Sequence, residues 1–184
     1  MSWAAELGVV AIPPAAGQVL RLLATATKAR AAVEIGTGTG VSSLWLLRGL
    51  APDGVLTSID IEPDHQAMAR QSFAAAGIAP GRARLIAGAA REVLPRLADA
   101  AYDLVFIDGD IGEYAHAVSA AHRLLRPGGV MIVNNALADG VDERVRLIIS
   151  ELTAYLRDTP DWSTTVLAVG AGLLCATKPW SEGR

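Results

Sequence analysis

Acidic and amide side chains follow three of the apolar runs in this sequence, each directly where the run ends. Asp60 follows the run that closes at Ile59, Asp108 follows Leu-Val-Phe-Ile, and the pair Asn134-Asn135 follows the next run. A carboxylate at such a position can accept ribose hydroxyls, face a cation, bind a metal or take up a proton. Since ligands of parallel sheets bind beyond the carboxyl ends of the strands, we expect these side chains to share one cleft.

A glycine-rich segment at residues 36–40, Gly-Thr-Gly-Thr-Gly, separates the apolar run Ala31–Ile35 from a helix-like stretch, Val41–Leu50. A strand that turns through glycines straight into a helix brings bare backbone N–H groups close to a ligand. Glycine has no Cβ and therefore also tolerates positive φ. The alternative interpretation is a plain tight turn. The positions that we expect at the ligand are Gly36, Thr37, Gly38 and Gly40.

The spacing of the glycines and a neighbouring acid indicate which ligand this segment binds. A dinucleotide-binding fingerprint is G-x-G-x-x-G, and Val41 stands where its third glycine belongs. Glu34, at the end of the preceding apolar run, would repel a pyrophosphate but attract a cation. S-adenosylmethionine (SAM) carries a sulfonium and an α-ammonium group and suits the segment. A nucleotide-binding oxidoreductase is disfavoured for the same two reasons.

Asp60 lies about 20 residues beyond the glycine segment, the spacing at which an acid accepts the hydroxyls of a ribose. The alternative is that Asp60 or Asp64 caps the helix that starts near Pro63. In the ribose interpretation, Ile61 lies against the adenine. His65 falls in the first turn of the same helix, and we expect it to be solvated.

Three further polar positions each have more than one interpretation. Asp108 can face the sulfonium or bind a metal, or it can cap the glycine-containing turn that follows it. The pair Asn134-Asn135 can form the floor of a polar cleft or an ordinary turn. Ser42, in the first helical turn after the glycine segment, can bond the methionine carboxylate or cap the helix.

The composition excludes several classes of protein. The 184 residues suit one domain, expected to span residues 1–184, and a net charge of −3 without a basic stripe disfavours nucleic-acid partners. No apolar run reaches the roughly 18 residues that a membrane span needs. The single cysteine, Cys175, lies in an apolar run and is expected to be a buried core residue. A lone cysteine fits a reducing compartment, so we expect a cytoplasmic protein.

Apolar runs and helix-like stretches alternate along the chain, which predicts an open, mostly parallel α/β sheet with helices on both faces. Residues 1–18 are expected to be a short leading segment, irregular up to Val19. The last two strands, Thr164–Val169 and Leu173–Thr177, are joined by glycines and should be antiparallel. The earlier strands are expected at Ala31–Ile35, Val55–Ile59, Arg84–Ala87, Leu104–Ile107 and Val130–Val133, the last after a turn at 126–129. The helices are expected at Gly17–Ala29, Val41–Leu50, Pro63–Ala76, Glu113–Leu125 and Asp142–Arg157.

Five segments in this order resemble the small SAM-dependent O-methyltransferases of the catechol and caffeoyl-CoA type, including their bacterial members. The resemblance runs from about Pro13 to the C-terminus, and the five segments together are more specific than any one of them. They are Val33–Gly40, Ser58–Pro63, Glu92–Pro95, Tyr102–Asp108 and Leu124–Gly129. The resemblance implies a Rossmann-like class I methyltransferase fold with seven strands, the last of them antiparallel.

The resemblance also implies a role for each matching residue. Asp60 would take the ribose hydroxyls, and Asp108 would lie near the transferred methyl group. Asp108 and Asn135 are the candidate catalytic residues. The residues implied at the methionine end of SAM are Glu34, Gly36, Gly38 and Ser42, and those implied at the adenine are Gly88, Ala89 and Ala90. The family's divalent-metal positions fall on Asp108, Asn134 and Asn135.

Three positions depart from the family pattern. Ala89 stands where many relatives have an acid, so the backbone would carry the recognition of adenine. Asn134 replaces one of two metal-binding aspartates, which weakens the attraction for Mg²⁺. Ile111 stands where relatives often have a lysine that helps to deprotonate the acceptor hydroxyl. We therefore expect no strong metal dependence, although a metal held by Asp108 and the two amides stays open.

The expected reaction is methyl transfer from SAM to a hydroxyl of a small, aromatic acceptor. Asp108 or Asp110 would serve as the base, unless the acceptor ionises readily by itself. The alternative is a protein that binds SAM or S-adenosylhomocysteine (SAH) and has a degenerate acceptor site with little or no transferase activity. Members of the family are often homodimers, so we expect a homodimer with no nucleic-acid or membrane partner.

Overall fold

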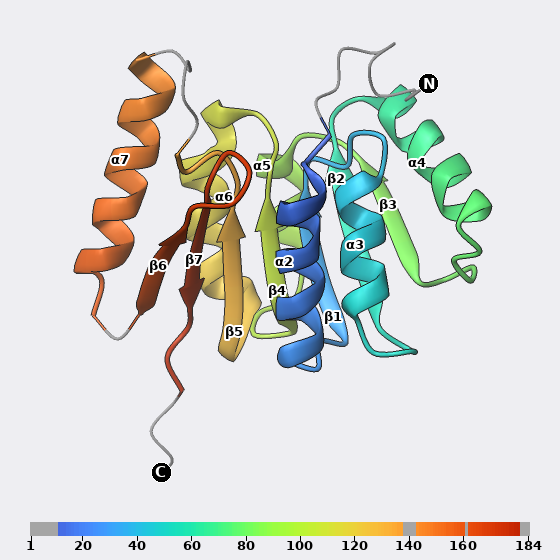
Figure 1. Cartoon of the computed structure of the whole chain (residues 1–184), viewed down its shortest axis with the longest axis horizontal. Helices are drawn as coiled ribbons and strands as arrows, with labels where there is room; N and C mark the ends of the chain where they lie inside the picture. The colour runs from blue at the N-terminus through green and yellow to red at the C-terminus, as the bar shows by residue number, and fades with distance from the viewer. Residues whose placement is uncertain (1–10, 138–142, 161, 181–184) are drawn as a thin grey trace.

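The computed structural model describes residues 11–137, 143–160 and 162–180, and Figure 1 shows them in colour. Their strands form one seven-stranded sheet in the order β3-β2-β1-β4-β5-β7-β6. Neighbouring strands from β3 to β5 are parallel, whereas β7 is antiparallel to both β5 and β6. The predicted sheet with an antiparallel last strand is confirmed. Strand order reverses between β1 and β4, the place at which open α/β sheets bind ligands.

Most of the predicted elements end within two residues of the observed bounds. The predicted helix start at Asp142 and residues 1–10 of the leading segment lie outside the described residues. The strands are β1 (Ala31–Ile35), β2 (Val55–Asp60), β3 (Ala83–Ala87), β4 (Tyr102–Ile107), β5 (Leu125–Val133), β6 (Ser163–Leu167) and β7 (Leu173–Thr177). The α-helices are α2 (Pro14–Ala26), α3 (Val41–Gly49), α4 (Pro63–Ala75), α5 (Ala90–Val93), α6 (Tyr114–Leu124) and α7 (Glu143–Asp158), and the 3-10 turns are η1 (Leu94–Arg96) and η2 (Ile111–Glu113).

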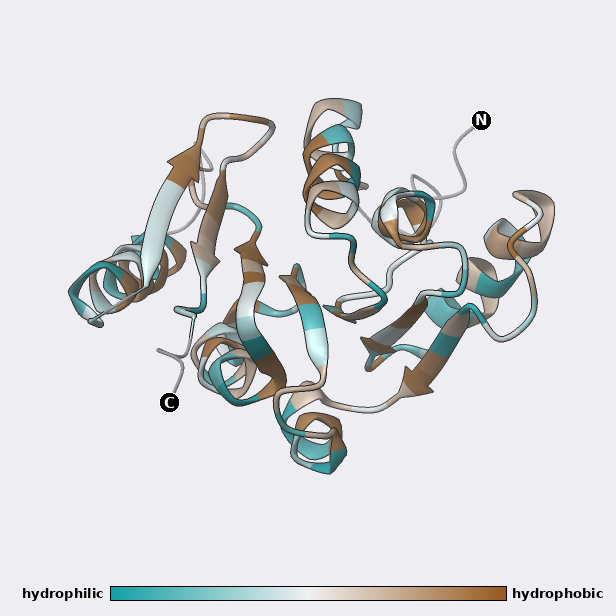
Figure 2. Ribbon diagram, turned by 90° about the horizontal axis from the view of Figure 1, so that it is seen from below, coloured by the Kyte–Doolittle hydropathy of each residue, from teal (hydrophilic) through white to brown (hydrophobic). Residues whose placement is uncertain are grey.

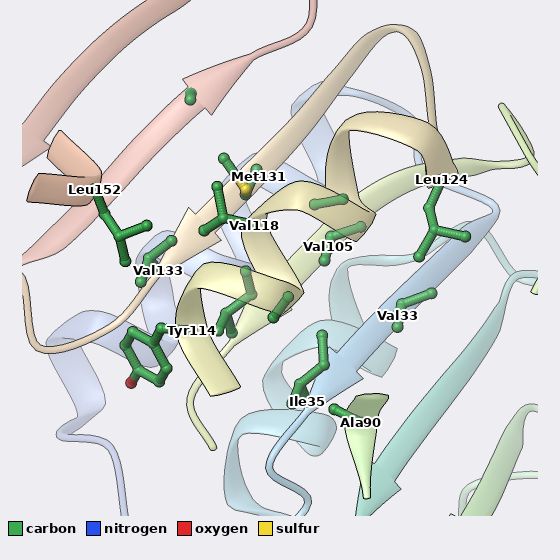
Figure 3. Close-up of a cluster of buried hydrophobic side chains, with 14 of the residues drawn as sticks. Val33, Ile35, Ala90, Val105, Tyr114, Val118, Leu124, Met131, Val133 and Leu152 are labelled. Carbon is green, nitrogen blue, oxygen red and sulfur yellow. The ribbon is translucent and has the colours of Figure 1, made fainter. Parts of the chain in front are cut away.

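Two hydrophobic clusters cover the two faces of the sheet. One joins α2, α3 and α4 to the strands through side chains such as Leu20 and Phe73. The other joins α5, α6 and α7 to the opposite face through side chains such as Val118 and Leu152, which Figure 3 labels. Figure 2 shows the resulting arrangement, with helices on both sides of the strands. Burial on both faces explains why the parallel strands read as continuous apolar runs.

The first helix begins earlier than the sequence predicted. α2 starts at Pro14, so the segment from 14 to 18 is helical and not irregular. Proline is favoured at a helix start because no N–H donor is needed there. Glycine is needed at position 17 inside the helix, because a Cβ there would lie only 2.2 Å from the indole of Trp45. The helix stops at Ala26 instead of residue 29, and Lys28 then adopts a positive φ of 50°.

The predicted turn at residues 126–129 lies inside β5, which begins at Leu125. The backbone does bend there, since Gly128 has a φ of 73°. The segment still pairs with the chain beyond β7, because Gly128 N donates to the carbonyl of Lys178 and Lys178 N donates to the carbonyl of Gly129. Pairing of Leu125 with Tyr102 of β4, together with the bonds to Lys178 just after β7, thus extends β5 across a local turn signal.

Two expectations drawn from the composition can be compared with the structure. Cys175 is buried, with 8% of its surface exposed, as predicted for a core residue. Burial raises the pKa of its thiol to about 11, which keeps it protonated and unreactive at neutral pH. None of the helices within the described ranges is long and apolar enough to cross a bilayer.

Candidate functional site

A cavity of about 370 Å³ lies at the carboxyl edge of the sheet. This volume falls within the range of sites for small molecules and cofactors. The segments that follow β1, β2, β3 and β4 all contribute to its lining, so it spans the reversal of strand order. The predicted site residues that line the cavity are Gly36, Thr37, Gly38, Ser42, Asp60, Ile61, Gly88, Ala90 and Asp108.

The glycine segment is held against two neighbouring strands. Gly36 has a φ of 95°, and a Cβ at this position would lie 2.4 Å from the carbonyl oxygen of Asp108. The N–H of Gly36 donates to Ile59 at 2.8 Å. Gly40 starts α3 and packs on Phe73 and does not line the cavity. Gly36 is therefore required by the close approach of the neighbouring strands, and Gly40 by the packing of α4.

Glu34 lies beneath the glycine segment and is completely buried, so its carboxyl group does not line the cavity. Its Oε2 accepts hydrogen bonds from the hydroxyls of Ser43 and Ser58, the latter at 2.6 Å. The Ser58 hydroxyl also lies 2.7 Å from that of Thr37, a residue of the loop. Oε1 has no partner among the described residues. A buried network of hydroxyl groups thus connects Glu34 to the loop above it.

Burial raises the pKa of Glu34 to about 7, even though hydrogen bonds from Ser42, Ser43 and Ser58 lower it. Ser42 thus lies close to Glu34 and also lines the cavity. The N-cap of α3 is Gly40, which has no side-chain cap, so the structure does not show the helix-capping role considered for Ser42. Proximity to Asp108 raises the pKa of Glu34 further.

Asp60 connects the glycine segment to the turn after β2. Its Oδ2 accepts from the N–H of Gly38 at 2.8 Å, and its Oδ1 accepts from the N–H of Glu62 at 2.9 Å. The side chain caps no helix, because the N-cap of α4 is Glu62 and carries no side-chain cap bond. His65 is partly exposed, with 24% of its side-chain surface accessible, and it lines the cavity with its Nδ1 3.3 Å from Asp60 Oδ1.

Asp108 contributes a second carboxylate to the cavity lining, from the strand end after β4. Its Oδ1 accepts a hydrogen bond from Asn134 Nδ2 at 2.8 Å, and its Oδ2 has no hydrogen bond from the described residues. Burial raises the pKa of Asp108 to about 6, and the bond from Asn134 lowers it in part. The following turn is capped by Asp110, whose side chain accepts from Gly112, so capping is not the role of Asp108.

Neither of the two asparagines belongs to the cavity lining. Asn134 is buried, and its Oδ1 has no partner among the described residues. Asn135 adopts a positive φ of 64°, which asparagine tolerates better than most residues. Its Nδ2 lies 3.4 Å from the hydroxyl of Tyr114, a long contact. The side chain of Asn134 thus supports Asp108, whereas that of Asn135 contacts α6.

The donor set around Asp108 fits a hard divalent cation poorly. Such ions prefer several carboxylate oxygens, and here one carboxylate stands with two amides. In the observed arrangement Asn134 directs its N–H₂ group toward Asp108, so its oxygen points elsewhere. The described residues hold no group of three or more His, Cys, Asp and Glu side chains that could bind a metal. One carboxylate and two amides therefore make a weak site for a hard cation.

The sequence analysis missed two groups of cavity residues. Glu62 and Glu113 line the cavity. Neither was predicted, because acids were assigned to the site only where they stand at the end of a predicted strand. Ala11 and Ile12 come from the segment before α2, which carries no motif. Ala89, by contrast, was predicted to border the adenine, but it is buried and does not line the cavity.

The residues present fit SAM. Asp60 and Asp108 supply negative charge to the cavity, which favours a cationic ligand. The glycine segment supplies backbone groups, and Ile61 offers an apolar side chain that is 62% exposed. The cavity thus offers a carboxylate for a ribose, an apolar side chain for the face of a base, and negative charge for a cationic end.

Comparisons with known proteins agree with this geometry. Residues 3–178 match the family model described as O-methyltransferase. A curated relative from Mycolicibacterium vanbaalenii, named only by family as an O-methyltransferase, is 46% identical over 182 residues, covering 95% of this chain and 80% of its own. A crystal structure of a Corynebacterium glutamicum protein is 33% identical, with a TM-score of 0.89 and coverage of 98% of this chain and 88% of its own.

A further solved structure links this fold to the cofactor. The O-methyltransferase TomG from Streptomyces achromogenes, solved in complex with SAM and involved in tomaymycin synthesis, is 30% identical to this chain. Its TM-score is 0.85, with coverage of 96% of this chain and 86% of its own. The cofactor expected from the sequence is therefore supported, as is the expected enzyme class. The chain belongs to the O-methyltransferase family, whose SAM-dependent fold and cofactor it shares.

Proposed function

We propose that this enzyme transfers the methyl group of SAM to a hydroxyl of a small aromatic acceptor, and that Asp108 takes up the hydroxyl proton. The observation that supports this role is that Asp108 lines the cavity, while its Oδ1 accepts from Asn134 and its Oδ2 accepts no hydrogen bond from the described residues. An aromatic hydroxyl is favoured because its pKa, about 10 for a phenol, is lower than that of an alcohol. Such an acceptor needs less help in losing its proton.

In this proposal one set of residues binds SAM and another takes part in proton transfer. SAM supplies a methyl group that is bonded to a sulfonium sulfur. When the acceptor oxygen forms the new C–O bond, the bond from sulfur to the methyl carbon breaks and the sulfur leaves as a neutral thioether. Asp60 would accept the ribose hydroxyls, and the glycine segment with Ser42 would hold the methionine end. Asp108 would receive the proton that the acceptor oxygen loses, and the bond from Asn134 would keep its carboxylate oriented. Glu34 would support the loop from below through Ser58.

This proposal assigns Asn134 and Asn135 no role as metal ligands. Asn134 is a positioning residue for Asp108, and Asn135 faces Tyr114 at the start of α6. The catalytic role expected for Asn135 stays a prediction, since the contact of its side chain is with Tyr114 and the residue does not line the cavity. The two amides are polar neighbours of the reacting group without the charge that a hard cation prefers.

The test is methyl transfer by Asp108→Asn across a panel of catechols, phenols and aliphatic alcohols. An asparagine can still accept from Asn134 but cannot take up a proton. We expect transfer to fall by about 10²–10⁴-fold while SAH binding, measured by calorimetry, changes little. Wild-type turnover confined to aliphatic alcohols would contradict the acceptor class. Unchanged transfer by the variant would contradict the role of Asp108.

Three expectations from the sequence remain part of this proposal. Residues 1–184 would act as one domain, since the described strands join a single sheet. The enzyme would form a homodimer, for which the exposed Leu147 and Tyr155 on α7 offer apolar surface. It would work in the cytoplasm without a nucleic-acid or membrane partner. Light scattering on the purified chain tests the dimer, and a monomer at micromolar concentration would contradict it.

A further inference from the structure

A carboxylate from a different part of the chain meets the segment that follows β3. Glu113, the last residue of η2, accepts a hydrogen bond at its Oε2 from the N–H of Ala90 at 3.2 Å. Both residues line the cavity. We propose that Glu113 determines specificity for adenine: its carboxylate, held beside residues 88–90 by the bond from Ala90, accepts a hydrogen bond from the 6-amino group. The inference rests on the proposed function, because it requires SAM in this cavity.

The order of the strands locates the base at this end of the cavity. The glycine segment follows β1, and Asp60 is the last residue of β2. Gly88 follows β3, which is the next strand toward the edge of the sheet. The N–H of Gly88 donates to the carbonyl of Asp60 at 2.9 Å, which holds the two segments side by side. A nucleoside that reaches Asp60 with its ribose and the glycine segment with its methionine part must therefore place its base against residues 88–90.

The carboxylate found there is complementary to the amino group of adenine. The edge of adenine that carries N1 presents a donor, the 6-amino group, beside an acceptor, the ring nitrogen. Glu113 Oε2 accepts from the Ala90 N–H at 3.2 Å, and the remaining lone pairs of the carboxylate can accept a hydrogen bond from the 6-amino group. A purine without the amino group would leave the carboxylate unpaired. A site built to bind an N–H group discriminates strongly against an analogue that lacks it.

The position of Glu113 is fixed by neighbours on two sides. Its N–H donates to the carbonyl of Asp110 at 3.0 Å, within the capped turn η2. Its Oε1 lies 3.6 Å from Arg91 Nη1, and only 21% of its side chain is exposed. The competing acceptor in the cavity is Glu62, which is exposed and belongs to the turn after β2. The hydrogen bond to Ala90 favours Glu113 over Glu62.

Calorimetric titration with SAH and with its analogue that carries purine in place of adenine tests the proposal. The wild type should prefer SAH by about tenfold to a hundredfold, the usual value of a hydrogen bond to a charged group. Glu113→Met removes the acceptor and should abolish the preference by weakening SAH alone. Glu113→Gln keeps an acceptor oxygen and should retain most of it. Glu92→Met, the same change at an exposed glutamate of α5, should leave both affinities unchanged.

Each other outcome overturns the proposal in a recognisable way. Equal weakening of both ligands by Glu113→Met would show a structural role only. Loss of the preference in Glu62→Met, with Glu113→Met unaffected, would assign recognition to Glu62. A wild type that binds SAH without any preference would overturn the inference regardless of how the variants fold. A wild type that binds neither ligand would contradict the proposed function itself.

Discussion

Glu34 carries its carboxyl group inside the protein, where burial raises its pKa to about 7 from the usual 4.5. The unfolded chain releases this proton at a lower pH than the folded protein does. Between pH 4.5 and about 7 the unfolded state therefore binds fewer protons, and stability falls as pH rises through this window. Above about pH 7 the ionised carboxylate of Glu34 stays buried, and one of its oxygens has no partner among the described residues. This buried charge lowers the free energy of unfolding.

Glu34→Gln should therefore flatten the dependence of stability on pH. We expect the wild type to lose about 2–3 kcal/mol between pH 4.5 and 7 from this residue, and the variant to lose much less. Asp108, whose pKa is raised to about 6, adds a smaller loss in the same direction that the variant retains. Urea denaturation at a series of pH values measures both. Identical slopes for the two proteins would contradict the account of Glu34.

Asp60 is the residue on which the ribose assignment depends. Asp60→Ala should weaken SAM binding by about 1–3 kcal/mol, because hydrogen bonds to a charged group are lost. Part of the loss would come through the loop, since Asp60 also accepts from Gly38. Asp64→Ala, at an exposed acid of α4, serves as the matched control and should bind SAM normally. A dissociation constant that Asp60→Ala leaves unchanged would remove the ribose role.

Among the elements, the loop after β1 depends most strongly on glycine. Gly36 and Gly81 both have a φ near 90°, but they differ in the space around them. A Cβ added at Gly36 would meet backbone atoms within 3 Å, whereas a Cβ added at Gly81 would meet nothing within 4 Å. Gly36→Ala should cost about 2–5 kcal/mol of stability, from strain at positive φ plus the collision with Asp108. Gly81→Ala should cost about 1–2 kcal/mol, from strain alone.

Thermal and urea unfolding of the two variants separates strain from collision. Equal losses at Gly36 and Gly81 would show that the approach of β1 to β4 does not require glycine. Because Gly36 also lines the cavity, its variant should bind SAH weakly, whereas Gly81→Ala should bind it normally. Unfolding and binding are measured on the same preparations.

The elements also show what the sequence could and could not predict. Apolar runs located β1, β2 and β7 almost to the residue, because parallel and central strands are buried on both faces. β5 was predicted five residues too short, since its first half is stabilised by pairing with Lys178, far away in the chain. α5 was not predicted, because four residues are too few to show a helical period.

The site shows the same division between local and distant information. Asp60, Asp108 and the glycine segment stand at strand ends, so spacing alone located them at the cavity. Glu113 escaped notice because it meets Ala90 across 23 positions of sequence, through the packing of α5 against α6. Glu34 was placed in the cavity because an acid beside a glycine loop attracts a cation. In the structure its carboxyl group is buried beneath the glycine segment, where it accepts hydrogen bonds from serine hydroxyls.

For the whole molecule, the donor set around Asp108 predicts how the enzyme responds to metals. Methyl transfer to a phenolic acceptor should persist in the presence of a chelator, to within about twofold of its rate with Mg²⁺, because one carboxylate and two amides hold a hard cation weakly. Asn134→Asp restores a second carboxylate and should increase any stimulation by Mg²⁺. Activity that a chelator abolishes in the wild type would contradict the metal-independent mechanism.

The central claim is that the cavity at the carboxyl edge of this sheet binds a cationic nucleoside through Asp60 and the glycine segment. Isothermal titration of the purified chain with SAM and SAH, beside NAD as a pyrophosphate-containing competitor, tests it most directly. We predict one site per chain for SAM and SAH, weakened by Asp60→Ala, and no heat with NAD. Binding of NAD, or no binding of SAM and SAH at millimolar concentration, would contradict the claim.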